Sequence, residues 1–129
     1  MEEANSKFHT SKEVIKQVAT DKLDEILAKG LFTIIDVRSP QGIQSQGSIP
    51  GAINIPLEEV KKQIDERNTT SESLLNGSGP FLFCCTGGVM SYMAAIHAQE
   101  NGLPGVHNLE SGHSAWKKWK EAQMAGQLI

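Results

Sequence analysis

The sequence predicts one α/β domain with a mainly parallel central sheet and helices on both faces. Short apolar runs of strand length, such as residues 31–37 and 81–84, alternate with stretches of helical periodicity. The size fits as well, because a chain of 129 residues that is 39% hydrophobic can bury one compact core. No internal repeat is visible, so we expect a single domain over 14–129 after a flexible polar segment at 1–13.

The first half of the domain is expected to supply three strands with helices between them. A short edge strand at 14–19 precedes a helix that Thr20 would cap and Gly30 would end. The β-branched run at 31–37 is typical of a central parallel strand. After it we expect a short helical turn from Ser39-Pro40, a short strand at 52–55 and a helix opened by Pro56.

The second half begins with a polar connection at 67–79, which Leu74 and Leu75 are placed to anchor. The elements expected after it are a buried strand from Phe81, a helix at 90–101, a strand at 105–109 and a helix that starts over 112–119. In the last helix Trp116 and Trp119 are spaced to cover the core. The pattern at 121–129 predicts no particular structure.

A cysteine at the junction of a strand and a helix is the main candidate for chemistry. Cys85 ends the buried strand, Gly87 and Gly88 form a tight loop, and a helix follows. Ligands bind at this edge of open α/β sheets, and N–H groups in such a loop stabilise an anion, so a Cys85 thiolate is favoured. The alternative is that Cys84 and Cys85 both pack as small hydrophobic residues, and local pattern alone leaves the two readings equal.

Several other side chains near this edge have structural interpretations. Asp36 and Arg38 are expected to form a partly buried pair that supports the next loop rather than to act in catalysis. Cys84 should face away from Cys85, because neighbouring residues in a strand point to opposite faces. His113 is expected at the surface, with a place beside the site as the alternative. The methionines of the helix after Cys85, at positions 90 and 93, are expected to fill the core.

Three stretches of the sequence resemble the rhodanese (thiosulfate sulfurtransferase) family in its short single-domain form. The first is Ile35-Asp36-Val37-Arg38-Ser39-Pro40 with the later segment 47–56, Gly-Ser-Ile-Pro-Gly-Ala-Ile-Asn-Ile-Pro. The second is the Cys85 loop, where Cys85, Gly88 and Ser91 match Cys-x-x-Gly-x-Arg-Ser. The third is 108–112, Asn-Leu-Glu-Ser-Gly, followed by Ala115-Trp116. Their order and spacing match the family over about residues 14–119. One stretch alone would be weak evidence for the family, but the three together are specific for it.

The resemblance implies a rhodanese-like domain that transfers sulfane sulfur through a persulfide on Cys85. Thiosulfate or a persulfide would be the donor, and glutathione, a protein cysteine or cyanide the acceptor. No metal or organic cofactor is required. The backbone N–H groups that would hold the substrate belong to six residues, namely Thr86, Gly87, Gly88, Val89, Met90 and Ser91.

The sequence departs from the family where the loop usually ends in arginine, since Met90 stands there and the loop carries no charged side chain. We therefore expect weak use of dianionic thiosulfate and better use of a less charged or protein-bound persulfide. The first alternative is a rhodanese-like binding or regulatory module with little turnover. The second, a cysteine phosphatase or arsenate reductase, is disfavoured because those enzymes grip an oxyanion with an arginine fork, and the chain's only arginines are Arg38 and Arg67.

The composition also indicates which classes of partner and which cellular location to expect. The formal net charge is −3 without a basic cluster, so we expect neither a nucleic-acid nor a membrane partner. The acidic, polar N-terminus lacks the apolar core of a signal peptide, and two adjacent cysteines make no disulfide framework. These features favour a cytoplasmic location. No group of histidines and cysteines shows metal-ligand spacing.

Overall fold

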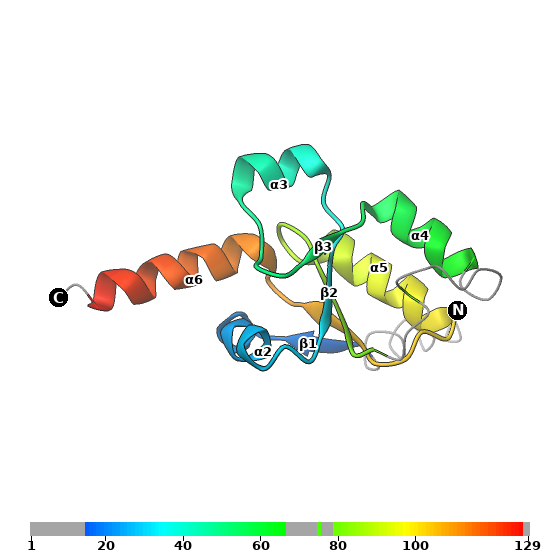
Figure 1. The fold of residues 1–129 in the computed structure, drawn as a ribbon, viewed down its shortest axis with the longest axis horizontal. Coiled ribbons are helices and arrows are strands. Elements are labelled where there is room, and N and C mark those ends of the chain that lie inside the picture. Colours follow the sequence, from blue (N-terminus) through cyan, green and yellow to red (C-terminus); the bar gives the residue numbers. More distant parts are fainter. Residues whose placement is uncertain (1–14, 67–74, 76–78, 128–129) are drawn as a thin grey trace, which may run out of the picture.

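The computed structural model describes residues 15–66, 75 and 79–127. Its elements follow in the order β1 (Lys16–Val18), η1 (Thr20–Lys22), α2 (Leu23–Lys29), β2 (Thr33–Asp36), α3 (Pro40–Gln46), β3 (Ile53–Asn54), α4 (Leu57–Glu66), β4 (Phe81–Cys84), α5 (Val89–Glu100), β5 (Val106–Leu109) and α6 (Gly112–Gln127) (Figure 1). The predicted alternation of strands and helices is therefore confirmed.

The five strands form one parallel sheet in the order β1-β5-β4-β2-β3. β4 lies in the middle, with Phe81 paired with Thr33 of β2 on one side and with Val106 of β5 on the other. β1 is an edge strand, as predicted. Because all strands run the same way, their carboxyl ends share one edge of the sheet, and the loops that follow β2, β4 and β5 meet there.

Helices cover both faces of the sheet, and the core is divided accordingly. Alternate residues of β4 point to opposite faces, so Phe81 and Phe83 join the cluster under α4 and α5, while Leu82 and Cys84 join the cluster under α2 and α6. Full burial of each of the three larger side chains, Phe81, Leu82 and Phe83, is worth about 1.5–3 kcal/mol. Leu75 is fully buried in the first cluster, which confirms its anchoring role, whereas Leu74 lies outside the described residues.

The helix ends follow the predicted chemistry with one exception. Gly30 ends α2 in the left-handed conformation (φ 62°), and Ser39 caps α3 by accepting a hydrogen bond from the Gly42 N–H. Thr20 was predicted to cap the first helix, and this is wrong, because Thr20 begins the short 3-10 turn η1 and α2 follows from Leu23 without a side-chain cap. The local pattern did not reveal that a tighter turn would precede the helix.

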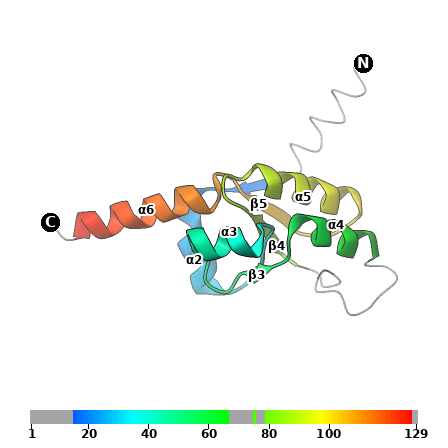
Figure 2. The ribbon, with the colours of Figure 1, turned by 90° about the horizontal axis from the view of Figure 1, so that it is seen from above.

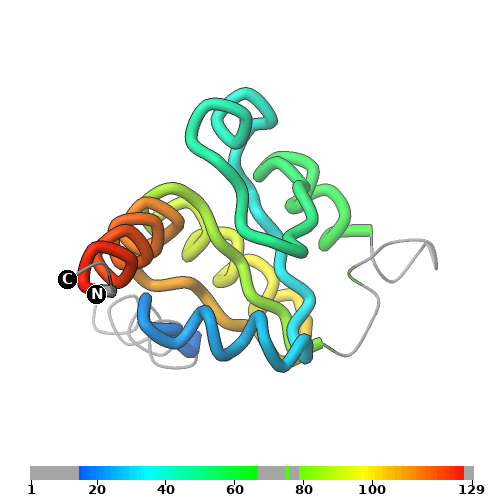
Figure 3. The backbone as a smooth tube through the Cα atoms, turned by 60° about the vertical axis from the view of Figure 1, so that its left-hand side comes forward, coloured from blue at the N-terminus to red at the C-terminus, as the bar shows by residue number. Residues whose placement is uncertain are grey.

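Two helices stand out from the sheet. α3 projects beyond the carboxyl ends of the strands, above the loop that follows β4 (Figures 1 and 3). α6 buries Trp116 and partly buries Trp119 against the sheet, as expected, and then continues past it to Gln127 (Figure 2). The region at 121–127, for which the sequence predicted nothing, is thus helical. In the part of the chain that the structure describes, no helix is long and apolar enough to cross a membrane.

Candidate active site

The sulfur of Cys85 lies at the centre of the loop that joins β4 to α5. The Cys85 Sγ accepts hydrogen bonds from the backbone N–H of Gly88 at 3.2 Å and of Ser91 at 3.3 Å. Only 3% of the residue is exposed. Two N–H dipoles aimed at one sulfur, at the first turn of a helix, favour negative charge on that atom. The arrangement suits a thiolate nucleophile.

Main-chain hydrogen bonds to the start of α6 hold this loop in place. The His113 N–H donates to the Cys85 carbonyl at 2.8 Å, and the Ser114 N–H donates to the Thr86 carbonyl at 3.0 Å. These donors are among the first N–H groups of α6, which have no partner within their own helix. The loop after β4 therefore caps α6, and in return α6 fixes the backbone on which the sulfur is carried.

Two glycines allow this close approach. Gly88 has φ 90°, and a Cβ there would lie 2.9 Å from the carbonyl carbon of Glu110 and nearer still to its oxygen. Gly112 has φ 75°, and a Cβ there would lie 2.6 Å from the carbonyl carbon of Thr86. Real Cβ atoms do not approach backbone so closely, and positive φ is strained for other residues. Both glycines are thus required by geometry, although only Gly88 was among the predicted site residues.

A buried ion pair supports the loop after β2, as predicted. Arg38 Nη2 contacts Asp36 Oδ2 at 2.6 Å, and the Arg38 backbone N–H also donates to this carboxylate. The two residues are 4% and 1% exposed. Asn54 of β3 donates to the backbone carbonyls of both at 3.0 and 2.9 Å. Arg38 is therefore neutralised by its neighbour and fixed below the site.

Gln46, the last residue of α3, lies beside the Cys85 loop, and no pattern in the sequence predicts this. Its Oε1 accepts hydrogen bonds from Arg38 Nη1 at 3.2 Å and from Thr86 Oγ1 at 3.0 Å. The carboxamide thus links the buried guanidinium to the residue next to Cys85. Nothing in the local sequence distinguishes Gln46 from Gln41 and Gln44 of the same helix, because the link joins positions 40 residues apart in the chain.

His113 was expected at the surface, and this is wrong. Only 3% of it is exposed, and its Nδ1 lies 3.4 Å from Arg38 Nη1. Burial, together with the Arg38 guanidinium, lowers the pKa of His113 below its ordinary value. The neutral ring can accept a hydrogen bond from Arg38. The alternative expectation, a place beside the site, fits better, because the ring lies next to Arg38 and near Gly47, the residue after α3, where an added Cβ would be 3.8 Å away.

The rim around the sulfur is uncharged. Val89 is 70% exposed and Met90 is 43% exposed, and none of the residues 86–91 that follow Cys85 has an ionisable side chain. Met93, one turn further along α5, is 51% exposed. The expectation that Met90 and Met93 fill the core is therefore wrong, because α5 buries its small side chains, Ala94, Ala95 and Ala98, against the sheet instead.

The two adjacent cysteines have separate environments. Cys84 lies in the cluster under α2 and α6, whereas Cys85 lies in the cluster under α4 and α5, which confirms that they face opposite ways. Both thiols are free. Burial and the nearby Asp36 carboxylate raise the pKa of Cys84 well above its ordinary value. Cys84 is therefore a neutral thiol in the core, consistent with its predicted structural role.

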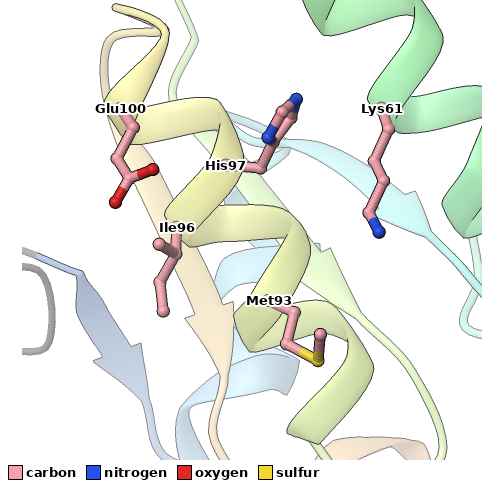
Figure 4. A pocket seen from close by; sticks show the side chains of 5 residues that line it. All are labelled: Lys61, Met93, Ile96, His97 and Glu100. Carbon is pink, nitrogen blue, oxygen red and sulfur yellow. The ribbon is translucent and has the colours of Figure 1, made fainter. Parts of the chain in front are cut away.

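A separate surface pocket of about 470 Å³ lies on the outer side of α5, next to α4 (Figure 4). It is lined by Lys61, Met93, Ile96, His97 and Glu100. None of these residues belongs to the Cys85 loop, and His97 pairs with Asp65 at 2.8 Å. Among the described residues, no group of three or more His, Cys, Asp or Glu side chains could hold a metal ion. The chemistry of the sheet edge therefore centres on Cys85.

Comparison with known proteins agrees with this geometry. The profile of the Rhodanese-like domain matches residues 19–118. The chain belongs to the rhodanese-like family. It is 32% identical over 109 residues to the mouse thiosulfate sulfurtransferase/rhodanese-like domain-containing protein 3, covering 81% of this chain and 68% of that one. The predicted family and fold class are thus confirmed.

Two further relatives of the rhodanese-like chain are informative. A human thiosulfate:glutathione sulfurtransferase is 29% identical over 105 residues, which cover 77% of this chain and 90% of the human one. A solved structure from Rhodopseudomonas palustris superposes with a TM-score of 0.78 at 27% identity, covering 87% of this chain and 86% of the other. That protein is described as of unknown function and a possible tyrosine phosphatase. The names of these two proteins point to two different reactions, sulfur transfer and phosphate ester hydrolysis.

Replacing Gly88 by alanine should destabilise the domain. The new Cβ would clash with the Glu110 carbonyl, and alanine is strained at the positive φ of this position. We therefore expect the free energy of unfolding to fall by about 1–3 kcal/mol or more. Gly87→Ala is the matched control, because nothing lies within 4 Å of a Cβ there. Urea denaturation of both variants measures the difference. Equal stability of the two would contradict the close packing of Gly88 on Glu110.

His113 should make stability depend on pH. Because its folded-state pKa is lowered, the folded protein resists protonation of the ring. Protonation of His113 therefore does not change the free energy of unfolding above about pH 6.5, the pKa of histidine in an unfolded chain. Below that pH the free energy of unfolding falls, because the unfolded chain binds the proton and the folded protein does not. Urea denaturation at pH 8 and at pH 5 measures how far the free energy of unfolding falls. The fall should be smaller in His113→Asn than in wild type, whereas the control His107→Asn should show the same fall as wild type. An unchanged slope in His113→Asn would show that the ring is not held neutral.

Proposed function

We propose that the protein is a sulfurtransferase that carries sulfane sulfur on Cys85. The observation that carries the proposal is the pair of N–H donors, from Gly88 and Ser91, aimed at the Cys85 Sγ. A rhodanese-like chain with sulfurtransferase-named relatives and a nucleophile at a helix N-terminus fits this activity better than any other.

The reaction divides into two displacements on sulfur. The Cys85 thiolate attacks the outer sulfur of thiosulfate, a new S–S bond forms, and the old S–S bond breaks as sulfite leaves with the electron pair. With a persulfide donor the leaving group is a thiolate. An acceptor thiolate, such as glutathione or a protein cysteine, then attacks the outer sulfur of the Cys85 persulfide, and the Cys85 thiolate leaves. No net oxidant or reductant is needed.

The loop backbone would stabilise the charge in both steps. The N–H groups of residues 86–91, Thr86, Gly87, Gly88, Val89, Met90 and Ser91, are proposed to hold the persulfide and the incoming anion. The Ser91 hydroxyl is buried and makes no hydrogen bond to any described residue, so it is available as a further donor to bound sulfur. Asp36 and Arg38 would support the loop from below without touching the substrate.

The uncharged rim sets the substrate class in this proposal. A cation about 4 Å from the thiolate is worth at most ~4 kcal/mol at an effective dielectric near 20, before desolvation is subtracted. Met90 supplies none of it. We infer weak binding of dianionic thiosulfate and better use of a less charged or protein-bound persulfide, whose apolar surroundings can contact Val89 and Met90. The site needs no metal or organic cofactor for these steps.

Two other functions are compatible with the fold. A rhodanese-like binding or regulatory module is favoured by one observation, the absence of a loop cation at Met90. A tyrosine phosphatase, as suggested for the Rhodopseudomonas palustris protein, is disfavoured here because Arg38 is committed to Asp36 and the loop has no arginine. Sulfur loading of Cys85 separates all three.

Incubation with thiosulfate or an organic polysulfide should add the mass of one sulfur atom to Cys85. Intact-mass and peptide mass spectrometry would locate the added sulfur. The Cys85→Ser variant should take up none, whereas the matched variant Cys84→Ala should be loaded like wild type, because the Cys84 thiol is neutral and faces the other side of the sheet. Sulfur on Cys84, or none on either cysteine, would contradict the proposed activity.

Restoring a loop cation should improve thiosulfate use. We expect Met90→Arg to raise kcat/KM for thiosulfate by about tenfold, which corresponds to about 1.4 kcal/mol, well within the electrostatic limit. Met93→Arg is the control, since it adds the same charge at an exposed position one turn away on α5. Steady-state sulfite release measures both. Equal gains in the two variants would mean that overall charge, rather than the loop position, limits turnover.

A further inference from the structure

Gln46 is held beside the Cys85 loop by hydrogen bonds from three segments of the chain, two to its side chain and one to its backbone. Its Oε1 accepts from Arg38 Nη1, just after β2, and from Thr86 Oγ1 in the Cys85 loop. Its backbone carbonyl accepts from Lys117 Nζ of α6 at 3.3 Å. The bond from the guanidinium is charge-assisted and comes from a residue that is itself only 4% exposed.

This arrangement leaves one end of the carboxamide available. The two bonds to Oε1 occupy its acceptor sites, whereas Nε2 carries two N–H donors. Among the described residues, Nε2 has no hydrogen-bond acceptor, and Gln46 is exposed to solvent. Because Oε1 accepts a hydrogen bond from Thr86, the residue after Cys85, the carboxamide lies beside the loop that carries the sulfur. They are free to bind a molecule that approaches it.

The charges around the site make such donors important. Apart from Cys85 itself, neither the Cys85 loop nor α3 contains an ionisable side chain, and the Arg38 guanidinium is neutralised by Asp36 at 2.6 Å. We propose that Gln46 determines donor specificity by hydrogen bonding, through Nε2, to the acidic head of the sulfur donor, such as the sulfonate oxygens of thiosulfate. The inference rests on the proposed sulfurtransferase function. In this proposal the Gln46 carboxamide recognises the acidic head of the sulfur donor, because the loop itself has no cation to do so.

Gln46→Glu is the most direct test, because glutamate keeps the acceptor oxygen for Arg38 and Thr86 but replaces the donors by negative charge. Two sulfur donors are compared, dianionic thiosulfate and the persulfide of N-acetylcysteine methyl ester, which has no acidic head. We expect kcat/KM to fall about tenfold or more for thiosulfate and less than about threefold for the ester persulfide. Gln44→Glu is the matched control, since it adds the same charge at an exposed position of the same helix.

Each other outcome overturns the inference in a recognisable way. Equal losses with both donors would mean that Gln46 only holds the loop, and equal effects of Gln44→Glu and Gln46→Glu would reduce the result to general repulsion. A larger selective loss in Lys117→Gln than in Gln46→Met would assign recognition to the Lys117 ammonium instead. If wild type forms no Cys85 persulfide from either donor, the proposed function itself fails, and this is seen before any variant is compared.

Discussion

The tightest constraint in this domain is the contact between two backbones at the carboxyl edge of the sheet. The loop after β4 and the start of α6 approach so closely that only glycine fits at positions 88 and 112. Each segment satisfies groups that the other leaves open, since the first N–H groups of α6 bond the carbonyls of Cys85 and Thr86. With the loop fixed in this way, its own N–H groups are left pointing at the sulfur of Cys85.

The charges near this junction are arranged to support the loop without reaching the sulfur. Arg38, the buried cation of the site, is paired with Asp36 and shares its remaining N–H groups with Gln46, Gly47 and His113. These contacts join the buried charges of Asp36 and Arg38 to polar groups at the surface, so neither buried charge is left without a partner. The consequence for chemistry is a sulfur atom stabilised by neutral dipoles, surrounded by a rim of apolar and amide side chains. In the proposed sulfurtransferase, such a rim would select substrates by shape and hydrogen bonding more than by charge.

The sheet-level features were predictable because each depends on residues close together in sequence. Alternating apolar runs gave the five parallel strands, Gly30 ended its helix, and the strand period placed Cys84 and Cys85 on opposite faces. The errors came from burial that other elements decide. Met90 and Met93 have the hydrophobicity of core residues, but α5 packs its alanines inward and leaves them exposed. His113 has the polarity of a surface residue, but it is buried beside Arg38 and near Gly47, the residue after α3.

The sequence by itself determined the family, the order of the elements and the position of Cys85 at the end of the central strand, because motif spacing and hydrophobic period are properties of the chain. It also determined that the loop has no cation. Only the tertiary structure decided which donors reach the sulfur and that Gln46 joins Arg38 to Thr86. Those contacts bring together β2, α3, the Cys85 loop and α6, and their geometry depends on how the elements pack rather than on any local pattern.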